Sequence, residues 1–439
     1  MTSTSVQFII HPSQKLQGTH RVPGDKSISH RAIMLGALAE GTTRISGFLE
    51  GEDTLATLAA FQRMGVPIEL SQSGKVTIQG KGLHGLNVPQ TSLYLGNSGT
   101  SMRLLAGLLA GQSFSSELHG DSSLSRRPMR RVTDPLTAMG AHIETATGGT
   151  PPLKIYGKQT LNGIDYTLPV ASAQVKSCLL LAGLYAQGTT CITEPVPTRD
   201  HTERMLTGFG YSITRVDQQI RVSGGGSLRA MTIDVPADIS SATFFMVGAS
   251  IAPGSDILLE HVGINPTRTG AIHILQKMGA DITLLDVREI GGEPVANIRV
   301  KASDLHGIEI PQEWVASAID EFPALFIAAA CAQGTTTLKG ASELRVKESD
   351  RIQVMADGLQ TLGIQAHPTA EGIIITGGNM IGGQINSHGD HRIAMAFTMA
   401  ALRTQDTIVI DDCANVATSF PNFVSLAQEA GIEIQQVLA

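Results

Sequence analysis

Basic residues that could bind anions stand in short clusters beside small polar residues. Such clusters occupy residues 24–31 (GDKSISHR), 96–103 (GNSGTSMR), 172–177 (SAQVKS) and 389–395 (GDHRIAM), each at the start of a predicted helix. A helix that begins with small polar residues exposes backbone N–H groups and the positive end of its dipole, which attract phosphate or carboxylate. Arginine adds paired hydrogen bonds to such groups, and lysine adds a point charge. The clusters therefore predict a site that holds several anionic groups.

Four further charged segments lie near the starts of predicted helices or in loops. They are residues 126–131 (RRPMRR), 198–201 (TRDH), 319–323 (IDEFP) and 344–351 (LRVKESDR). If the starts of these helices converge, the segments together form one anion site around a cleft.

Structural roles remain open for several of these residues. Inside predicted helices, Arg103 and Lys176 are expected to form structural pairs. Three arginines are expected on a solvated face: Arg126, Arg130 and Arg131. Arg127 differs because it precedes a proline that restricts its backbone. Three small polar residues could act simply as helix caps: Ser27, Asn97 and Ser172.

Charge and motif content exclude several functional classes. A net charge of −7 is not expected of a dedicated nucleic-acid binder. Neither a P-loop nor a dinucleotide-binding glycine motif occurs. The four cysteines are far apart, and His30, His201 and His391 lack metal-ligand spacing, so we expect reduced thiols and no metal site. No apolar run is long enough to cross a membrane, and no signal-peptide pattern is present, which predicts a cytoplasmic protein.

The elements that must position these clusters recur six times along the chain. Each copy has a helix rich in small residues, a glycine turn, a β-rich run, and a second helix that ends at a glycine. Glycine directly after a helix favours a left-handed cap and so marks the helix end. The six predicted cap glycines are Gly65, Gly140, Gly210, Gly279, Gly363 and Gly431.

The six copies fall into two groups of three. Residues 22–27 (VPGDKS) resemble residues 235–240 (VPADIS), and both look like the entry to a domain in which Asp caps a helix. We therefore expect two similar α/β domains joined by two strands. Residues 23–234 would form the first domain, and residues 1–22 with 235–439 the second. A cleft between two such domains is a natural ligand site.

Seven motifs in one order give the chain a specific family resemblance. They read GDKSISHR, NSGT, RPM, SAQVKS, IDEFP, RVKESDR and DHRIAM. From about residue 14 to 435, the chain resembles the 5-enolpyruvylshikimate-3-phosphate synthase family. The resemblance implies two three-repeat domains, each an inside-out α/β barrel. It also implies shikimate-pathway chemistry in aromatic amino acid biosynthesis: phosphoenolpyruvate and shikimate 3-phosphate give an enolpyruvyl ether and phosphate through a tetrahedral intermediate. A monomer without metal or organic cofactor is implied as well.

The resemblance also implies roles for individual residues. Asp320 would bond the ring hydroxyls and act as base, and Glu348 and Lys26 are candidates for proton transfer at C3. Lys347 would reach a substrate oxygen. Phosphoenolpyruvate would be clamped by Arg127, Arg351 and Arg392, with Gly99 and Lys26 nearby. Shikimate 3-phosphate would be held by Lys26, Ser27, Arg31, Ser172, Ala173, Gln174 and Arg199. Three more residues complete the expected substrate-binding set: Asn97, Thr100 and His391. Asp320 and Glu348 could instead be helix caps or ion-pair partners.

The chain departs from the family pattern at two positions. Many members carry a lysine just before the last Phe-Pro, where this chain has Ala417, Thr418 and Ser419, so a lysine role there cannot be carried over. Glu343 stands where some members have a substrate-binding asparagine. Some herbicide-tolerant members have alanine where this chain has Gly99, so sensitivity to glyphosate is a hypothesis.

Two other functions stay open. One is the sister enolpyruvyl transferase that acts on UDP-N-acetylglucosamine. That family typically has a cysteine in the loop before Arg-Pro, and residues 121–125 (DSSLS) contain none. The other is a polyanion-binding module with the same fold and no catalysis.

Overall fold

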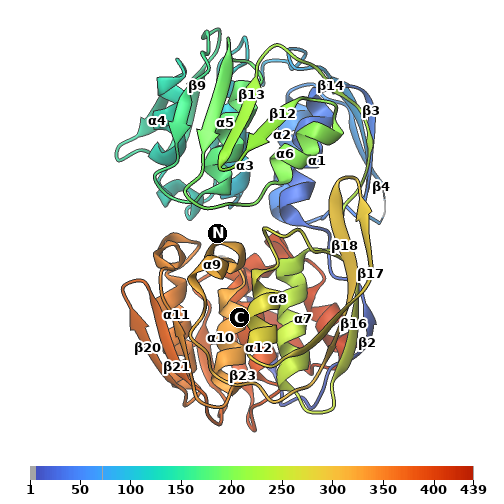
Figure 1. The fold of residues 1–439 in the computed structure, drawn as a ribbon, viewed down its shortest axis with the longest axis vertical. Coiled ribbons are helices and arrows are strands. Elements are labelled where there is room, and N and C mark those ends of the chain that lie inside the picture. The colour runs from blue at the N-terminus through green and yellow to red at the C-terminus, as the bar shows by residue number, and fades with distance from the viewer. Residues whose placement is uncertain (1–5, 72, 439) are drawn as a thin grey trace. The chain divides into compact units, whose positions relative to one another are not determined.

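The first helix of each predicted repeat is largely buried. The computed structural model describes residues 6–71 and 73–438. In α7 (Ile239–Ile251), all residues are buried, which is typical of a helix that is apolar on every side. The six inner helices, all labelled in Figure 1, are α1 (Lys26–Leu38), α3 (Gly99–Ala110), α5 (Ala173–Gly183), α7 (Ile239–Ile251), α10 (Phe322–Cys331) and α12 (His391–Ala400).

The second helix of each repeat ends where the sequence predicts. The six predicted cap glycines all have positive φ, from +81° at Gly210 to +117° at Gly431, which confirms the stop signals. After α13 (Phe423–Ala430), the N–H of Gly431 donates to the carbonyls of Ala427 and Gln428 and closes the last turn. These helices are α2 (Glu52–Arg63), α4 (Arg130–Ala138), α6 (His201–Gly208), α8 (Gly270–Lys277), α11 (Arg351–Thr361) and α13 (Phe423–Ala430). A short helix, α9 (Gln312–Val315), precedes α10. No helix among the described residues is long and apolar enough to cross a membrane.

The chain divides into two compact units. Unit 1 comprises the described residues of Met1–Pro23, Pro236–Glu289 and Glu293–Ala439, and unit 2 comprises those of Gly24–Val235 and Ile290–Gly292. The turn Ile290–Gly292 joins β17 (Asp281–Ile290) to β18 (Glu293–Lys301) and is assigned to unit 2, whereas the rest of both strands belongs to unit 1. The sequence does not indicate this detail.

Unit 2 contains three sheets, one for each repeat. The first has the order β14-β3-β5-β4, with β15 also paired to β3; the others are β6-β7-β9-β8 and β10-β11-β13-β12. The strands are β3 (Ala39–Ser46), β4 (Ile68–Ser71), β5 (Lys75–Lys81), β6 (Leu93–Tyr94), β7 (Ser116–His119), β8 (His142–Ala146), β9 (Thr150–Tyr156), β10 (Asp165–Thr167), β11 (Thr189–Thr193), β12 (Ile213–Val216), β13 (Gln219–Ser223), β14 (Leu228–Arg229) and β15 (Thr232–Asp234).

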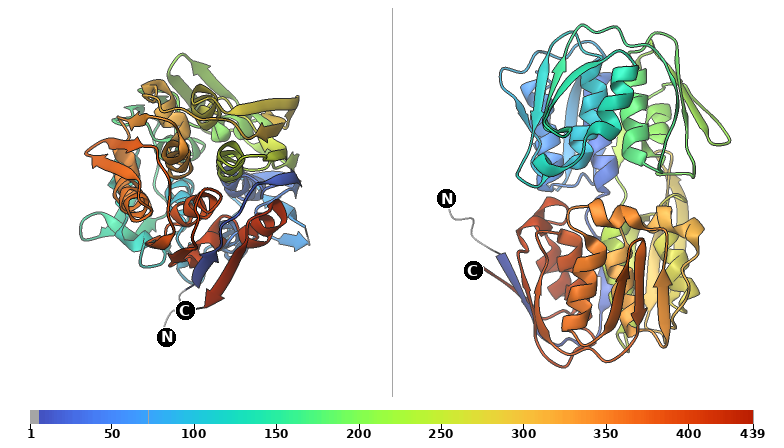
Figure 2. Two further views of the ribbon diagram at one scale, coloured as in Figure 1. Left: turned by 90° about the horizontal axis from the view of Figure 1, so that it is seen from below. Right: turned by 90° about the vertical axis from the view of Figure 1, so that its left-hand side faces the viewer.

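Unit 1 also contains three sheets, with the orders β17-β18-β16-β2, β19-β21-β20 and β22-β23-β1-β24. Its first strand lies antiparallel beside its last, near the two ends of the chain (Figure 2). In this pairing, Phe8 lies opposite Gln436. The strands are β1 (Val6–Ile10), β2 (Gln17–His20), β16 (Asp256–Gly263), β17 (Asp281–Ile290), β18 (Glu293–Lys301), β19 (Thr335–Leu338), β20 (Gln365–Thr369), β21 (Gly372–Thr376), β22 (Gly383–Asn386), β23 (Ile408–Asp411) and β24 (Ile434–Leu438).

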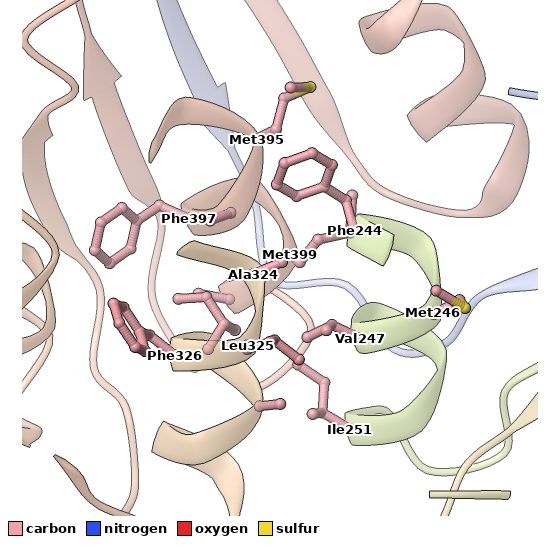
Figure 3. Close-up of a cluster of buried hydrophobic side chains, with 14 of the residues drawn as sticks. Phe244, Met246, Val247, Ile251, Ala324, Leu325, Phe326, Met395, Phe397 and Met399 are labelled. Atoms are coloured by element: carbon pink, nitrogen blue, oxygen red, sulfur yellow. The ribbon is translucent and has the colours of Figure 1, made fainter. Parts of the chain in front are cut away.

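Each unit has its own hydrophobic core around its inner helices. In unit 1, Val247 of α7, Leu325 of α10 and Phe397 of α12 belong to one buried cluster (Figure 3). A separate cluster in unit 2 gathers α1, α3 and α5. The α/β fold class with three αβ repeats in each unit is therefore confirmed. Across the described residues, the strands of a unit form three separate sheets and no closed barrel.

Candidate active site

In unit 2, the inner helices begin at polar caps. The Asp25 carboxylate accepts from the N–H of Ile28 at 2.8 Å, and the Ser98 hydroxyl accepts from the N–H of Ser101 at 3.1 Å. Ser172 caps α5. Of the three residues that could act simply as caps, only Ser172 does so. Ser27 lies inside the first turn of α1 and Asn97 precedes the cap of α3, which leaves both side chains available for other partners.

Arg31 is a buried arginine that joins two repeats of unit 2. Its Nε donates to the Thr202 hydroxyl at 2.7 Å, and one Nη donates to the Ser177 hydroxyl at 2.8 Å. The other Nη donates to the Ser27 carbonyl at 2.8 Å. These bonds fix the guanidinium between α1, α5 and α6. Near the start of α1, Lys26 Nζ lies 3.2 Å from an Asp53 carboxylate oxygen.

Arg127 is held in place by a neighbouring amide. One Nη donates to Asn97 Oδ1 at 2.5 Å, and Asn97 Nδ2 donates to Asp121 Oδ2 at 2.8 Å. Gly99 lies directly against the same guanidinium, since a Cβ built on this glycine would be 2.9 Å from the other Nη of Arg127. Arg126 and Arg130 are exposed, as predicted for a solvated face, whereas Arg131 is half-buried.

Gln174 connects the second and third repeats of unit 2. Its carbonyl oxygen accepts a hydrogen bond from Arg103, and its Nε2 donates to the Thr100 hydroxyl at 3.0 Å. The structural pairing predicted for Arg103 is thereby confirmed. Ala173 follows Ser172 in the first turn of α5.

Lys176 supports the loop that carries Arg199. Its fully buried Nζ lies 2.7 Å from Glu203 and 3.1 Å from Glu194, and it donates to the Thr198 carbonyl at 3.3 Å. The predicted structural pairing of Lys176 is confirmed. Arg199 itself, half-buried, follows Thr198 in the chain.

His30 is a buried neutral base between the first two repeats. Its Nδ1 lies 2.8 Å from the Thr57 hydroxyl and 3.3 Å from the Ser101 hydroxyl. Burial, reinforced by the charges of Lys26 and Arg31, lowers the pKa of His30 well below its usual value. Hydroxyl groups from the first two repeats thus hold the imidazole ring of His30 in place.

In unit 1, Arg351 is the centre of a cluster of carboxylates. It is 1% exposed at the start of α11. Its Nε lies 2.8 Å from Asp390 Oδ2, and its Nη atoms lie 2.7 Å from Glu348 Oε2 and 3.4 Å from Asp320 Oδ1. Burial alone would lower the pKa of Arg351, but these three carboxylates raise it above its ordinary value. Arg351 is therefore a permanent cation, and three acidic groups are gathered around it. We call these four residues the Arg351 cluster.

Asp320 connects the Arg351 cluster to two further cations. Lys347 Nζ lies 3.2 Å from its carboxylate, and an Nη of Arg392 donates to its backbone carbonyl at 3.0 Å. His391 lies buried in the first turn of α12, beside Arg392. Lys347 and Arg351 thus meet at the Asp320 carboxylate. Glu348 joins them through Arg351, and Arg392 joins them through the backbone carbonyl of Asp320. Both Asp320 and Glu348 are ion-pair partners, the alternative that the sequence left open, and this pairing is compatible with a catalytic role.

Asp390 was missed by sequence reasoning, although it stands inside a motif used for the prediction. It is fully buried, caps α12 and accepts from Arg351, from the Ser349 hydroxyl at 3.0 Å and from the backbone N–H of Arg392 at 3.0 Å. Its position directly before His391 could have identified Asp390 as the cap of the predicted helix, because aspartate is a common helix cap. Its contact with Arg351 depends on how α11 and α12 pack. Asp121, which orients Asn97, was also missed, and its contact with Asn97 likewise depends on packing.

Each unit is thus an α/β fold that fixes buried arginines with hydrogen bonds or ion pairs, as Arg31 is fixed in unit 2 and Arg351 in unit 1. Residues 10–426 match the sequence profile of EPSP synthase (3-phosphoshikimate 1-carboxyvinyltransferase). The chain is 66% identical over 435 residues to the 3-phosphoshikimate 1-carboxyvinyltransferase of Nitrosococcus oceani, covering 99% of this chain and 98% of that protein. Identity to the protein of the same name from Methylococcus capsulatus is 65%, over 99% of this chain and all of that protein.

Solved structures agree with these sequence comparisons. An EPSP synthase structure from Acinetobacter baumannii superposes with a TM-score of 0.89 at 58% identity, covering 99% of this chain and all of that chain. The chain belongs to the EPSP synthase family.

Proposed function

We propose that the Arg351 cluster and the cations of unit 2 serve one reaction, that of the EPSP synthase family. As a member of this family, the chain is an enolpyruvyl transferase: it moves the enolpyruvyl group of phosphoenolpyruvate to shikimate 3-phosphate and releases phosphate. The observation that carries the residue assignment is the position of Asp320, within ion-pair distance of both Lys347 and Arg351.

The two substrates bring two phosphates and two carboxylates into one site. Like charges about 4 Å apart repel by about 4 kcal/mol at an effective dielectric constant of 20, so cations must offset them. In the proposal, Arg127, Arg351 and Arg392 clamp phosphoenolpyruvate, with Gly99 leaving room for it. Shikimate 3-phosphate is held by the starts of α1 and α5, through Lys26, Ser27, Arg31, Ser172, Ala173 and Gln174, and by Arg199. Asn97, Thr100 and His391 complete the contacts.

Proton transfer is assigned to the carboxylates and to Lys26. Asp320 accepts the proton of the 5-hydroxyl while that oxygen bonds to C2 of phosphoenolpyruvate. C3 receives a proton from Glu348 or Lys26, which gives the tetrahedral intermediate. The C–O bond to phosphate then breaks as C3 gives a proton back to Glu348 or Lys26, so that the C2–C3 double bond forms again, now in the enol ether. Lys347 contacts a substrate oxygen beside Asp320.

These assignments require residues of both units to act on the same pair of substrates. We therefore place the active site in a cleft between the two units and propose that substrate binding closes it. Small-angle scattering with analogues of both substrates bound should give a smaller radius of gyration than the protein alone. Unchanged dimensions would contradict closure.

Several finer assignments complete the proposal. The enzyme acts as a cytoplasmic monomer on small molecules, with no nucleic acid or membrane partner and with no cofactor. Sensitivity to glyphosate is also proposed, because Gly99 has no side chain to displace Arg127: a Cβ there would lie 2.9 Å from an Nη of Arg127. Normal turnover at high glyphosate with phosphoenolpyruvate held low would contradict it.

The activity is tested by phosphate release on mixing the protein with shikimate 3-phosphate and phosphoenolpyruvate. Release with this pair, and none when UDP-N-acetylglucosamine replaces shikimate 3-phosphate, is expected. The reverse preference would identify the sister transferase. Binding of both substrates without release would indicate a polyanion-binding module.

A further inference from the structure

A polar hollow lies in the third repeat of unit 2. Its volume is about 840 Å³, within the range of small-molecule sites. It is formed by the residues that follow α6, by strands β11 to β13, by the loop that follows β13 and by Arg229 of β14. The lining residues are Thr189, Gly210, Tyr211, Ser212, Thr214, Arg221, Ser223, Gly224, Gly225, Gly226, Ser227 and Arg229.

The hollow lies at the opposite end of this repeat from the candidate active site. β11 begins at Thr189, in the hollow, and leads away from it toward the loop that carries Arg199. Likewise, α6 begins near that loop at His201 and ends just before Gly210, in the hollow. No residue assigned to the proposed reaction lines it.

The charge of the lining is positive although the protein is acidic overall. Arg221 and Arg229 are both exposed, and neither Asp nor Glu is among the lining residues. One Nη of Arg221 donates to the Gln219 amide oxygen at 2.8 Å, which orients the guanidinium and leaves its other donors for a ligand. Arginine suits phosphate and carboxylate because it donates paired hydrogen bonds to them.

Hydrogen bonds fix the wall of the hollow. The Tyr211 hydroxyl donates to the Ser223 carbonyl at 2.6 Å and accepts from the N–H of Gly226 at 3.2 Å. The Thr189 and Ser223 hydroxyls lie 2.8 Å apart across the paired strands. A Cβ on Gly226 would lie 2.7 Å from the Tyr211 ring, so this turn requires glycine. The hydroxyl groups and the two arginines are therefore presented on a wall that is ordered before any ligand arrives.

We propose that this hollow binds a small organic anion that carries phosphate or carboxylate groups. Arg221 and Arg229 supply the charge, and the hydroxyls of Ser212, Thr214 and Ser227 supply further hydrogen bonds. The site is separate from the reaction centre and takes no part in the chemical step.

Site-resolved arginine labelling tests the proposal on the full-length protein. Phenylglyoxal modification is measured by peptide mass spectrometry, which reports each arginine separately, so labelling of active-site arginines does not affect the result for Arg221 and Arg229. The probes are pyrophosphate and citrate, each against sodium chloride at equal ionic strength. We expect at least one probe to slow the labelling of Arg221 and Arg229 with a common half-saturation concentration. Exposed Arg63 on α2 serves as the internal control and should be unaffected. The probe that protects distinguishes a phosphate site from a carboxylate site.

Calorimetric titration of variants provides the second measurement. The R221Q/R229Q double variant should bind the protecting anion at least about tenfold more weakly than wild type, while R63Q should bind it normally. Turnover by R221Q/R229Q without added anion should match that of wild type, which also reports correct folding. Protection of all three arginines alike, protection of none, or unchanged affinity in R221Q/R229Q would overturn the proposal.

Discussion

Arg351 Nε lies 2.8 Å from Asp390 Oδ2, and both side chains are almost completely buried. A second contact, from Arg351 Nη to Asp390 Oδ1 at 3.2 Å, makes the pair bidentate. Two parallel bonds fix the plane of the guanidinium as well as its position. The edge of Arg351 that reaches Glu348 and Asp320 is therefore oriented by a residue outside the proposed set of substrate contacts.

Replacing Asp390 by Asn should weaken use of phosphoenolpyruvate. The amide keeps the shape but donates where the carboxylate accepts, so Arg351 loses its charged anchor. A hydrogen bond to a charged group contributes about 1.5–3 kcal/mol, which corresponds to roughly a 10- to 100-fold fall in kcat/KM for phosphoenolpyruvate. Steady-state kinetics measure this effect, and circular dichroism checks the fold, because breaking a buried ion pair also costs stability.

Ser349→Ala is the matched control for Asp390→Asn. It removes one neutral donor to the same carboxylate and leaves the bidentate pair with Arg351 intact. Its kcat/KM should change only a few-fold. A folded Asp390→Asn enzyme with wild-type kcat/KM for phosphoenolpyruvate would show that Asp390 does not position Arg351 for the reaction.

Gly99→Ala should raise the KM for phosphoenolpyruvate more than it changes kcat. The new Cβ would lie 2.9 Å from an Nη of Arg127, closer than real Cβ contacts, so the guanidinium must move. Losing part of one charge-assisted bond predicts about a tenfold rise in KM. Inhibition by glyphosate should weaken in the same variant.

Gly378→Ala is the control for this substitution. Its Cβ would meet only the Ile364 side chain, at an ordinary 3.5 Å. Both KM and kcat should stay close to wild type. If Gly99→Ala and Gly378→Ala behave alike, the contact with Arg127 does not determine phosphoenolpyruvate binding.

His30 should make the protein less stable as the pH falls. Its pKa is lowered in the folded protein by burial and by the charges of Lys26 and Arg31, whereas the unfolded chain has the ordinary value of about 6.5. Below about pH 6.5 the unfolded state therefore binds a proton that the folded state does not, and stability falls by up to about 1.4 kcal/mol per pH unit.

Urea unfolding at a series of pH values between neutral and mildly acidic tests this prediction. The His30→Gln variant should lose this part of the pH dependence, even if its stability at neutral pH is lower. His367→Gln, at an exposed position on β20, is the control and should keep the wild-type slope. Equal slopes for wild type and His30→Gln would mean that His30 is protonated in the folded protein as well.

The repeats were predictable because each is marked by local chemistry. A glycine such as Gly65 is needed wherever a helix must end in a left-handed residue, and aspartates such as Asp25 and Asp238 cap helices in the order that their motifs predict. The gathering of Asp320, Lys347 and Arg351 was also anticipated, since all three stand in motifs of the family.

Contacts made by helix packing were not predictable from local patterns. Asp390 was recognisable as a cap, but not as the partner of an arginine that lies 39 positions earlier. In the fourth repeat, Arg268 lies buried between Asp238 and Glu321, although no basic motif marks the start of α7. Asn97 was a candidate cap, and its actual bonds to Arg127 and Asp121 depend on a loop that the sequence alone does not place.

The most direct test of the proposed reaction centre is the turnover of Asp320→Asn. The substitution removes the proposed base while keeping the shape of the side chain and the backbone carbonyl that holds Arg392. General base catalysis contributes about 10²- to 10⁴-fold, so kcat should fall within that range while calorimetry shows that shikimate 3-phosphate still binds. A kcat within a few-fold of wild type would contradict the account.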